Sequence, residues 1–237
     1  MVNMMREHTT MDSRIHYVIT DGGSAPNVVP ETAEVFYYVR HSDTGEVEAM
    51  WKRLEDAAKG AALGTGTQVE WEIIHGNNPL LVNETLAKMM DGKLREIGGM
   101  QLSEEEKRFA SEIAKTLAAP KPVEQAAAIE PYGKTLGYGS TDVGDVSWAT
   151  PTVGLNTASW APGTPAHSWQ SAAASGTSMG FKGAQLAAKA MTLAAIQLYT
   201  DPALRQAARA EFDASRGPNY QYRSLLGDRK PPLDFRK

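Results

Sequence analysis

The sequence predicts a mixed α/β fold, in which an α+β part is followed by a part where helices and strands alternate. Residues 1–76 contain segments of alternating apolar residues around one amphipathic helix, whereas residues 77–237 contain several long segments of helical periodicity. With 237 residues, 42% of them apolar, the chain is long enough for two small domains that each bury a core. We therefore expect two domains, one over 1–76 and the other over 77–237.

The first part has the order strand, strand, helix, strand. Residues 15–20 and 33–40 alternate in polarity and are joined by a Gly/Pro/Asn turn, which predicts an antiparallel pair. Residues 46–63 have helical spacing and are followed by glycines, and residues 68–74 alternate again. This order is most of a ferredoxin-like layer, whose full pattern would add a strand and a helix in front. Because residues 1–9 have the pattern of a helix end, we expect a truncated start.

The second part is dominated by helices. Ser103 and Glu106 have the spacing of a capping box at the start of one of them. In the longest helix, the periodicity predicts a buried side that contains Leu186, Ala190, Leu193 and Ile196. The tail 217–237 contains aromatics and prolines without periodicity and is expected to follow the surface. The predicted helices span 79–96, 103–117, 178–200 and 202–215.

A central stretch, residues 137–170, has the composition of a site. It reads as a Gly/Ser/Thr-rich turn, a short strand over 151–155 and a Pro/Gly loop that presents His167. The rigid prolines Pro162 and Pro165, which precede the histidine, hold it in place without burying it in a helix. The alternative is a surface connection with a solvated histidine, since one histidine does not make a site.

Composition excludes several classes of protein. The net charge of −4 and the dispersed basic residues argue against a nucleic-acid partner. No stretch approaches the length of a membrane span, and the first residues lack the apolar core of a signal peptide. The absence of cysteine excludes thiolate chemistry and suits a reducing compartment. We therefore expect a cytoplasmic protein whose chemistry uses histidines, carboxylates or hydroxyls.

Three blocks of sequence carry a resemblance to a known family. The blocks are HYVITDGGSAPNVVPETAEVFYYVR, GSTDVGDVSW and PGTPAHSW. Together they closely resemble the di-metal aminoacylase and carboxypeptidase G-type amidohydrolases, and the similarity covers nearly the whole chain. The resemblance implies a ferredoxin-like lid that dimerises, over 1–76, and the C-terminal part of a zinc-peptidase-like catalytic domain, over 77–237. It also implies two zinc or manganese ions and an N-acyl amino acid substrate, such as an aminobenzoyl-glutamate.

The same resemblance implies roles for particular residues. His167 is similar to the family's last metal ligand, and His16 to a lid histidine that reaches into the active site of the partner subunit and holds the developing oxyanion. The remaining candidates resemble residues that contact the substrate, with Arg40 a candidate for its carboxylate. These substrate-binding candidates are Asn27, Arg40, Gly139, Ser140, Thr141 and Asp142.

The sequence departs from the family at the metal site. The family's first ligands lie in a His-x-Asp motif and a Glu-Glu pair whose first member is the general base, and nothing here supplies them. The run Glu104 to Glu106 sits at a helix start, where acidic residues are favoured by the helix dipole. Since one ligand cannot hold a metal pair, we expect the chain alone to bind no metal stably and to be inactive.

Two other functions stay open. The exposed sheet edge would suit an interaction module that pairs with another copy, or a split enzyme that pairs with a separate N-terminal chain. A third possibility is that the central loop binds a small ligand without chemistry.

Each candidate residue also has a purely structural interpretation. His16 could occupy the polar face of an edge strand, and Arg40 could be a solvated strand end. Asn27 could be an ordinary turn residue. Asp142 and Asp145 could cap backbone amides rather than bind metal. The tryptophans could line an aromatic pocket or pack in the core, and they are Trp148, Trp160 and Trp169.

Overall fold

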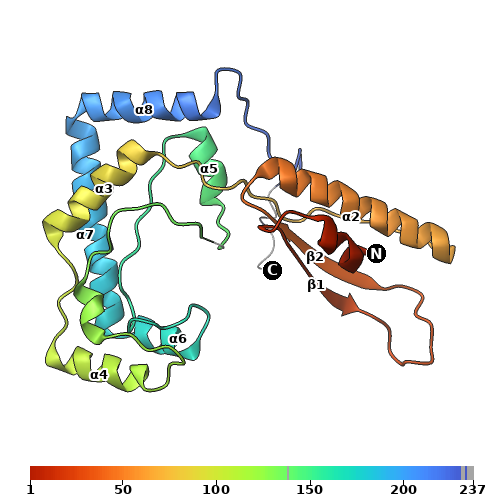
Figure 1. Cartoon of the computed structure of the whole chain (residues 1–237), viewed down its shortest axis with the longest axis horizontal. Helices are drawn as coiled ribbons and strands as arrows, with labels where there is room; N and C mark the ends of the chain where they lie inside the picture. The colour runs from red at the N-terminus through yellow and green to blue at the C-terminus, as the bar shows by residue number, and fades with distance from the viewer. Residues whose placement is uncertain (138, 231–232, 234–237) are drawn as a thin grey trace. The chain divides into compact units, whose positions relative to one another are not determined.

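The computed structural model describes residues 1–137, 139–230 and 233. Tyr138 of the central stretch and positions 231–232 and 234–237 of the tail lie outside the described residues. The chain divides into two compact units, and the fold mixes helices with one small sheet (Figure 1). The first unit comprises Met1–Leu80, Ser140–Asp145 and Arg223–Lys237, and the second comprises Leu81–Gly139 and Val146–Tyr222.

The first unit is built on an antiparallel strand pair. Strand β1 (Arg14–Asp21) pairs with strand β2 (Glu34–Arg40), and Arg14 lies opposite Arg40. Helix α2 (Thr44–Thr65) packs on one face of this pair, together with the short helix α1 (Val2–Met5), and the 3₁₀ turn η1 (Arg6–His8) follows α1. The strand pair and the helix after it confirm the prediction. The buried core of this unit consists of Met5, Ile15, Met50 and Leu54.

Helix α2 has clear sequence signals at both ends. The Asp43 side chain accepts a hydrogen bond from the Glu46 amide, which satisfies one of the free donors of the first turn. Gly66 ends the helix with φ of 69°, a left-handed conformation that glycine adopts without strain. Glycine at this position therefore sets the length of the helix.

The predicted third strand over residues 68–74 is wrong. The structure assigns no strand there, although the apolar alternation is present. Instead, side chains hold the segment: the Lys59 ammonium lies 5.0 Å from the centre of the Trp71 ring, and Arg229 donates to the Ile73 carbonyl at 2.7 Å. A strand requires a neighbouring edge for its backbone hydrogen bonds, and within the described residues the sheet contains β1 and β2 only.

The second unit is helical. Helices α3 and α8 both pack on the long helix α7. Among the described helices of the chain, none has the length and apolar character needed to cross a membrane. Helix α5 (Val143–Ala149) begins in the first unit and ends in the second. The other elements of the second unit are α3 (Glu84–Ile97), α4 (Glu104–Ala114), η2 (Val123–Ala127), α6 (Trp169–Ser175), α7 (Ser178–Thr200) and α8 (Pro202–Arg216).

Two apolar clusters form the cores of this unit. One lies among α3, α7 and α8 and contains Leu86, Met89, Met90, Ala190, Ala194 and Ala208. The other lies among α4, η2 and the start of α7 and contains Met100, Ala110, Ile113, Ala126, Ala161 and Met179. The small residues on α7 let its neighbours approach closely, because a helix that presents alanines has little side chain to hold other elements away.

The structure corrects four predictions in the second part. The segment 151–155 is not a strand: Val153 and Leu155 pack on the first cluster, but no strand partner is present among the described residues. Residues Val143–Ala149 form a helix where a turn was predicted, because turn hydrogen bonds to residues 141 and 142 lead directly into it. Helix α3 begins at Glu84 rather than at residue 79, because Asn83 caps it. Ile196 is 53% exposed and lies outside the buried face.

Glu106 joins helix α4 to helix α7. Its carboxylate accepts from the Ser103 amide at 2.6 Å, which completes the predicted capping box, and from the Lys182 ammonium at 2.6 Å. The hydrogen bond from Lys182, followed by the one from the Ser103 amide, lowers the pKa of the Glu106 carboxyl to about 2. Because only 6% of this side chain is exposed, the pair is poorly screened by solvent.

We predict that replacement of Glu106 by Gln lowers the free energy of unfolding at about pH 7 by roughly 2 kcal/mol. This is less than the full pKa shift would give, because solvent partly screens the exposed Lys182. The folded pKa lies below the usual value near 4.5, so the stabilisation is complete above that value and is lost as the pH falls towards 2. Denaturant titrations between about pH 7 and pH 3 should show the wild type and the variant converging. The control is replacement of the exposed neighbour Glu105 by Gln, and a constant difference at all pH values would contradict the prediction.

Candidate functional site

Two candidate residues share one face of the first unit's sheet. Ile15 points towards α2, so its neighbour His16 points to the opposite face, since side chains alternate along a strand. His16 lies opposite Tyr38, and Arg40 lies two residues further along β2 on the same face. His16 is exposed and Arg40 is half-buried. The sheet therefore presents an imidazole and a guanidinium as diagonal neighbours.

Arg40 contacts the loop that contains four of the other substrate candidates, Gly139 to Asp142. The Arg40 Nη2 donates to the Ser140 Oγ at 2.8 Å, across 100 positions of sequence. Thr141 accepts from the Val143 amide through its Oγ1, so it caps the start of α5, and Asp142 is exposed. Gly139 precedes them and is also exposed. The structure thus brings Ser140 beside a second candidate, Arg40, that comes from a distant part of the chain.

Asn27 lies elsewhere in this unit. It is at the third position of a turn closed by the Val28 amide and the Ala25 carbonyl, in the loop between β1 and β2. This loop follows Asp21, at the opposite end of the strand pair from Arg40 (Figure 1). Within one copy of the unit, Asn27 is therefore not brought beside Arg40, and the turn interpretation describes it.

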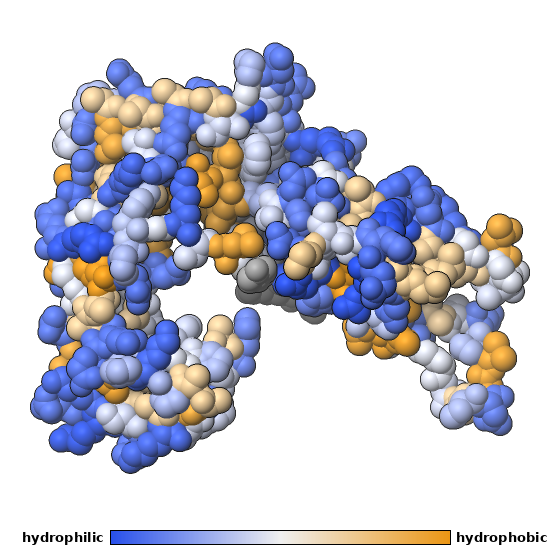
Figure 2. Space-filling model, in the orientation of Figure 1, coloured by the Kyte–Doolittle hydropathy of each residue, from blue (hydrophilic) through white to orange (hydrophobic). Residues whose placement is uncertain are grey.

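Exposed apolar residues also lie on the strands. Figure 2 shows hydrophobic surface over the strand pair, where Val18, Ile19 and Val35 are each more than a third exposed. Apolar surface on a two-stranded sheet is typical of a sheet that is covered by another element or chain.

The second unit presents His167 in an unusual backbone conformation. Its φ is 59°, and it is the one residue other than glycine with positive φ among the described residues. Histidine adopts this left-handed region more often than most residues but still at a cost, and such strain persists where the surroundings enforce it. His167 is exposed and directly precedes Ser168, which caps α6.

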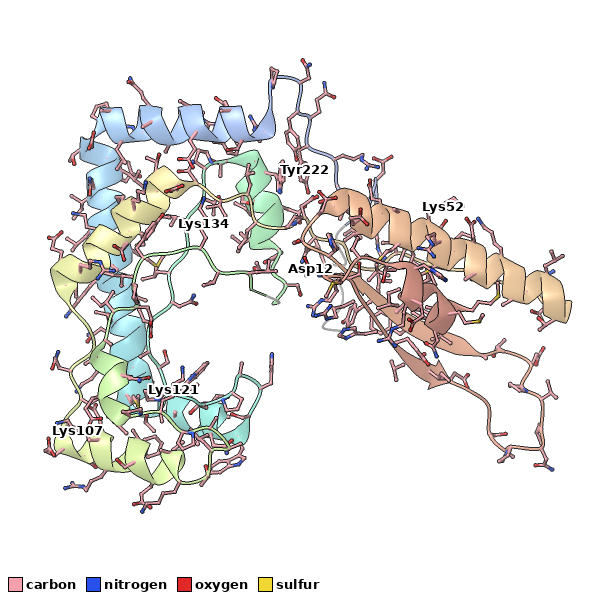
Figure 3. All side chains as sticks on the ribbon, viewed as in Figure 1. Asp12, Lys52, Lys107, Lys121, Lys134 and Tyr222 are labelled. Carbon is pink, nitrogen blue, oxygen red and sulfur yellow. The ribbon has the colours of Figure 1, made fainter. Side chains whose placement is uncertain are left out.

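The loop before His167 is firmly anchored. Ala161 is fully buried in the α4 cluster, and the Lys121 amide donates to the Pro162 carbonyl at 3.3 Å (Lys121 is labelled in Figure 3). Gly163 has φ of 89°, and a Cβ there would lie 2.5 Å from the Ala119 carbonyl oxygen. The hydroxyl of Thr164 is buried without a hydrogen-bond partner in the described structure. The histidine is thus held at a defined place on the surface of this unit.

The donor set of the described residues does not fit a metal pair. No group of three or more His, Asp or Glu side chains in that part of the chain could hold a metal ion. His167 supplies one imidazole, and a stable site needs several ligands. The Glu104 to Glu106 run serves helix α4, as the sequence indicated.

Sequence reasoning missed Asn78, which holds the end of the segment that contains Ser140. Asn78 donates to the Asp145 carboxylate from its backbone amide at 3.2 Å and from its side chain at 2.8 Å. The sequence suggested that Asp145 could cap a backbone amide, but nothing in it pointed to Asn78. Trp148 stacks on Tyr220, with ring centres 5.0 Å apart, which supports the packing interpretation of that tryptophan.

The comparisons with known proteins support the family that the three sequence blocks predicted, because the relatives are named as a hydrolase and as dipeptidases, that is, as amidohydrolases and peptidases. The chain is similar to the p-aminobenzoyl-glutamate hydrolase subunit of Escherichia coli (strain K12), with 34% identity over 88% of this chain and 49% of that protein. It is also similar to the Xaa-Arg dipeptidases of Mus musculus (28% identity, 89% of this chain and 43% of that protein) and Homo sapiens (30% identity, 44% and 24%). No family model matches the chain.

Coverage limits what these relatives imply. The chain spans about half the length of the Escherichia coli hydrolase subunit and somewhat less of the mouse dipeptidase. The activity of the complete relatives therefore bears on this chain only as a proposal.

We predict that replacement of Gly163 by Ala destabilises the His167 loop, because the new Cβ would overlap the Ala119 carbonyl and the backbone has positive φ. The free energy of unfolding should fall by about 1–3 kcal/mol, and the NMR signals of the His167 imidazole should shift. Gly154 is the matched control: it is exposed, and no atom lies within 4 Å of a Cβ built there. Equal effects of the two substitutions would contradict the prediction.

Proposed function

We propose that this chain is the C-terminal portion of a metal-dependent amidohydrolase that cleaves an N-acyl amino acid such as p-aminobenzoyl-glutamate. The observation that supports this most directly is 34% identity to the Escherichia coli p-aminobenzoyl-glutamate hydrolase subunit over 88% of the chain. In this proposal residues 1–76 are the lid, and residues 77–237 are part of the catalytic domain. The enzyme is cytoplasmic and uses zinc or manganese.

The chain's own residues have defined roles in the proposal. Arg40 and Ser140 bind the carboxylate of the amino acid, since a guanidinium and a hydroxyl beside it are good donors to such a group. His16, on the same sheet face, donates to the carbonyl oxygen as negative charge develops there, in the active site of a partner copy. Asn27, at the other end of the sheet, would act on the substrate of a different copy or not at all.

Metal binding needs residues from outside the described chain. His167 would supply one ligand, and the described donor set does not complete the site. We therefore propose that the chain alone is inactive and that the remaining ligands and the general base come from the half of the relatives that this chain does not match.

A second candidate function is an interaction module. Residues 68–74 keep the alternation of a strand without a strand partner in the described residues, and Trp71 is 45% exposed. A partner strand could use this segment or the free edge of β2. The partner could be another copy, which would give a homo-oligomer through the sheet, or a separate chain, in line with the relative's name as a subunit.

The test is to measure metal content and hydrolysis for the chain alone, for the chain mixed with the unmatched half of the Escherichia coli relative, and for a fusion of the two. We expect no hydrolysis of p-aminobenzoyl-glutamate and little bound zinc or manganese by the chain alone, and both in the fusion. Replacement of His167 by Ala should remove tightly bound metal from the fusion, while replacement of exposed His8 by Ala should not.

The other outcomes are informative. Hydrolysis by the chain alone, with metal that the His167 substitution removes, would refute the proposal that the chain is incomplete. A stable complex in the mixture that binds no metal and hydrolyses nothing would favour the interaction module. The full-length Escherichia coli protein serves as the positive control for the assay.

A kinetic prediction separates the two lid residues. In the active fusion, replacement of His16 by Ala should lower kcat by about 10²–10³-fold with little change in KM, because an oxyanion donor acts mainly in the transition state. Replacement of Arg40 by Ala should mainly raise KM, because the carboxylate is bound in the ground state as well. Steady-state kinetics with p-aminobenzoyl-glutamate measures both, and the opposite pattern would reverse the assignments.

A further inference from the structure

A short segment of the chain belongs to a different unit from the residues on either side of it. Ser140–Asp145 groups with the first unit, whereas residues up to 139 and from 146 group with the second. This segment contains three of the substrate-binding candidates, and its contacts with the first unit determine where they lie.

Hydrogen bonds hold the end of the segment. One oxygen of the Asp145 carboxylate accepts from the Asn78 side-chain amide at 2.8 Å, and the other accepts from the Asn78 backbone amide at 3.2 Å. The Asn78 side-chain oxygen accepts in turn from the Thr44 hydroxyl at 2.9 Å, at the first residue of α2. Since all of these side chains are short and α2 is packed on the sheet, the network fixes Asp145 relative to the strands.

Backbone contact fixes the same place independently. Gly144 is buried, and a Cβ on it would lie 1.9 Å from the Asn78 carbonyl oxygen. The two backbones can be this close only because residue 144 has no side chain. The segment is thus located both by a close approach and by paired hydrogen bonds to the same residue.

The other end of the segment then meets Arg40. Ser140, which lies before Gly144 in the same segment, accepts from the Arg40 guanidinium at 2.8 Å. A guanidinium has several donors in a planar fork, and a hydroxyl beside it can donate to the same anion. The position of Ser140 therefore decides whether both groups can reach one carboxylate.

We propose that Asn78, Gly144 and Asp145 are positioning residues that hold Ser140 beside Arg40, so that the first unit presents a preformed site for the carboxylate of the substrate. This inference rests on the proposed function for the identity of the ligand. In this inference, the first unit of the chain binds the substrate carboxylate by itself, and this binding does not require the metal site.

The test uses the complete 237-residue chain and needs no catalysis. The probe is p-aminobenzoyl-glutamate, titrated while the NMR signal of the Arg40 side chain is followed, and its uncharged diester is the control ligand. We expect the wild type to bind the acid and not the ester. Replacement of Asp145 by Ala or Gly144 by Ala should weaken binding at least tenfold and shift the Arg40 signal before ligand is added. Asp145→Asn keeps one acceptor for Asn78 and should restore part of the affinity.

A matched control separates positioning from charge and from stability. Asp12 is exposed in the same unit (labelled in Figure 3), and its replacement by Ala removes the same charge and should leave binding unchanged. Thermal unfolding of each variant shows that binding is compared between folded chains. Wild-type affinity in the Asp145→Ala variant, or no selective binding by the wild-type chain, would overturn the inference. Selective binding by a chain whose fusion hydrolyses nothing would instead refute the proposed function.

Discussion

The close approach of Gly144 to Asn78 is the constraint on which the candidate substrate site depends. It joins two segments that are far apart in sequence, and the two hydrogen bonds from Asn78 to the Asp145 carboxylate fix how these segments are aligned. Arg40 belongs to a strand that α2 already holds in place, so it is the loop with Ser140 that must be positioned. A glycine and a carboxylate just beyond the candidate Gly139–Asp142 stretch thus control its geometry.

Local signals made several helices predictable. Ser103 and the Asp201-Pro202 pair start helices where the sequence indicated, because a capping side chain satisfies donors of its own first turn. The antiparallel pair was predictable for a similar reason, since the two strands are joined directly and the pairing needs nothing outside them. These elements depend on residues close together in sequence.

The wrongly predicted strands have a different origin. Residues 68–74 and 151–155 have the apolar pattern of strands, but a strand exists only beside another edge. In residues 151–155, the side chains of Val153 and Leu155 pack on the first apolar cluster, but the backbone pairs with no strand among the described residues. The sequence pattern predicts which side chains are buried, but it does not predict whether the backbone has a neighbouring strand. The predicted sheet was therefore larger than the observed one.

The candidate site was predictable by residue type and family resemblance, but its support was not. The resemblance named His16, Arg40, Ser140 and His167, and the alternation along the strand predicted the face of His16. The Asn78 contact and the left-handed backbone at His167 could not be predicted, because nothing in the local sequence pattern points to them. Each compact unit supports its own candidates. In the first unit, Asn78 and Arg40 hold the segment with Ser140, and in the second, the Gly163 contact holds the loop before His167. Because these contacts lie within separate units, we expect a substitution at Gly163 to leave the Arg40–Ser140 contact unchanged, and a substitution at Asp145 to leave the His167 loop unchanged.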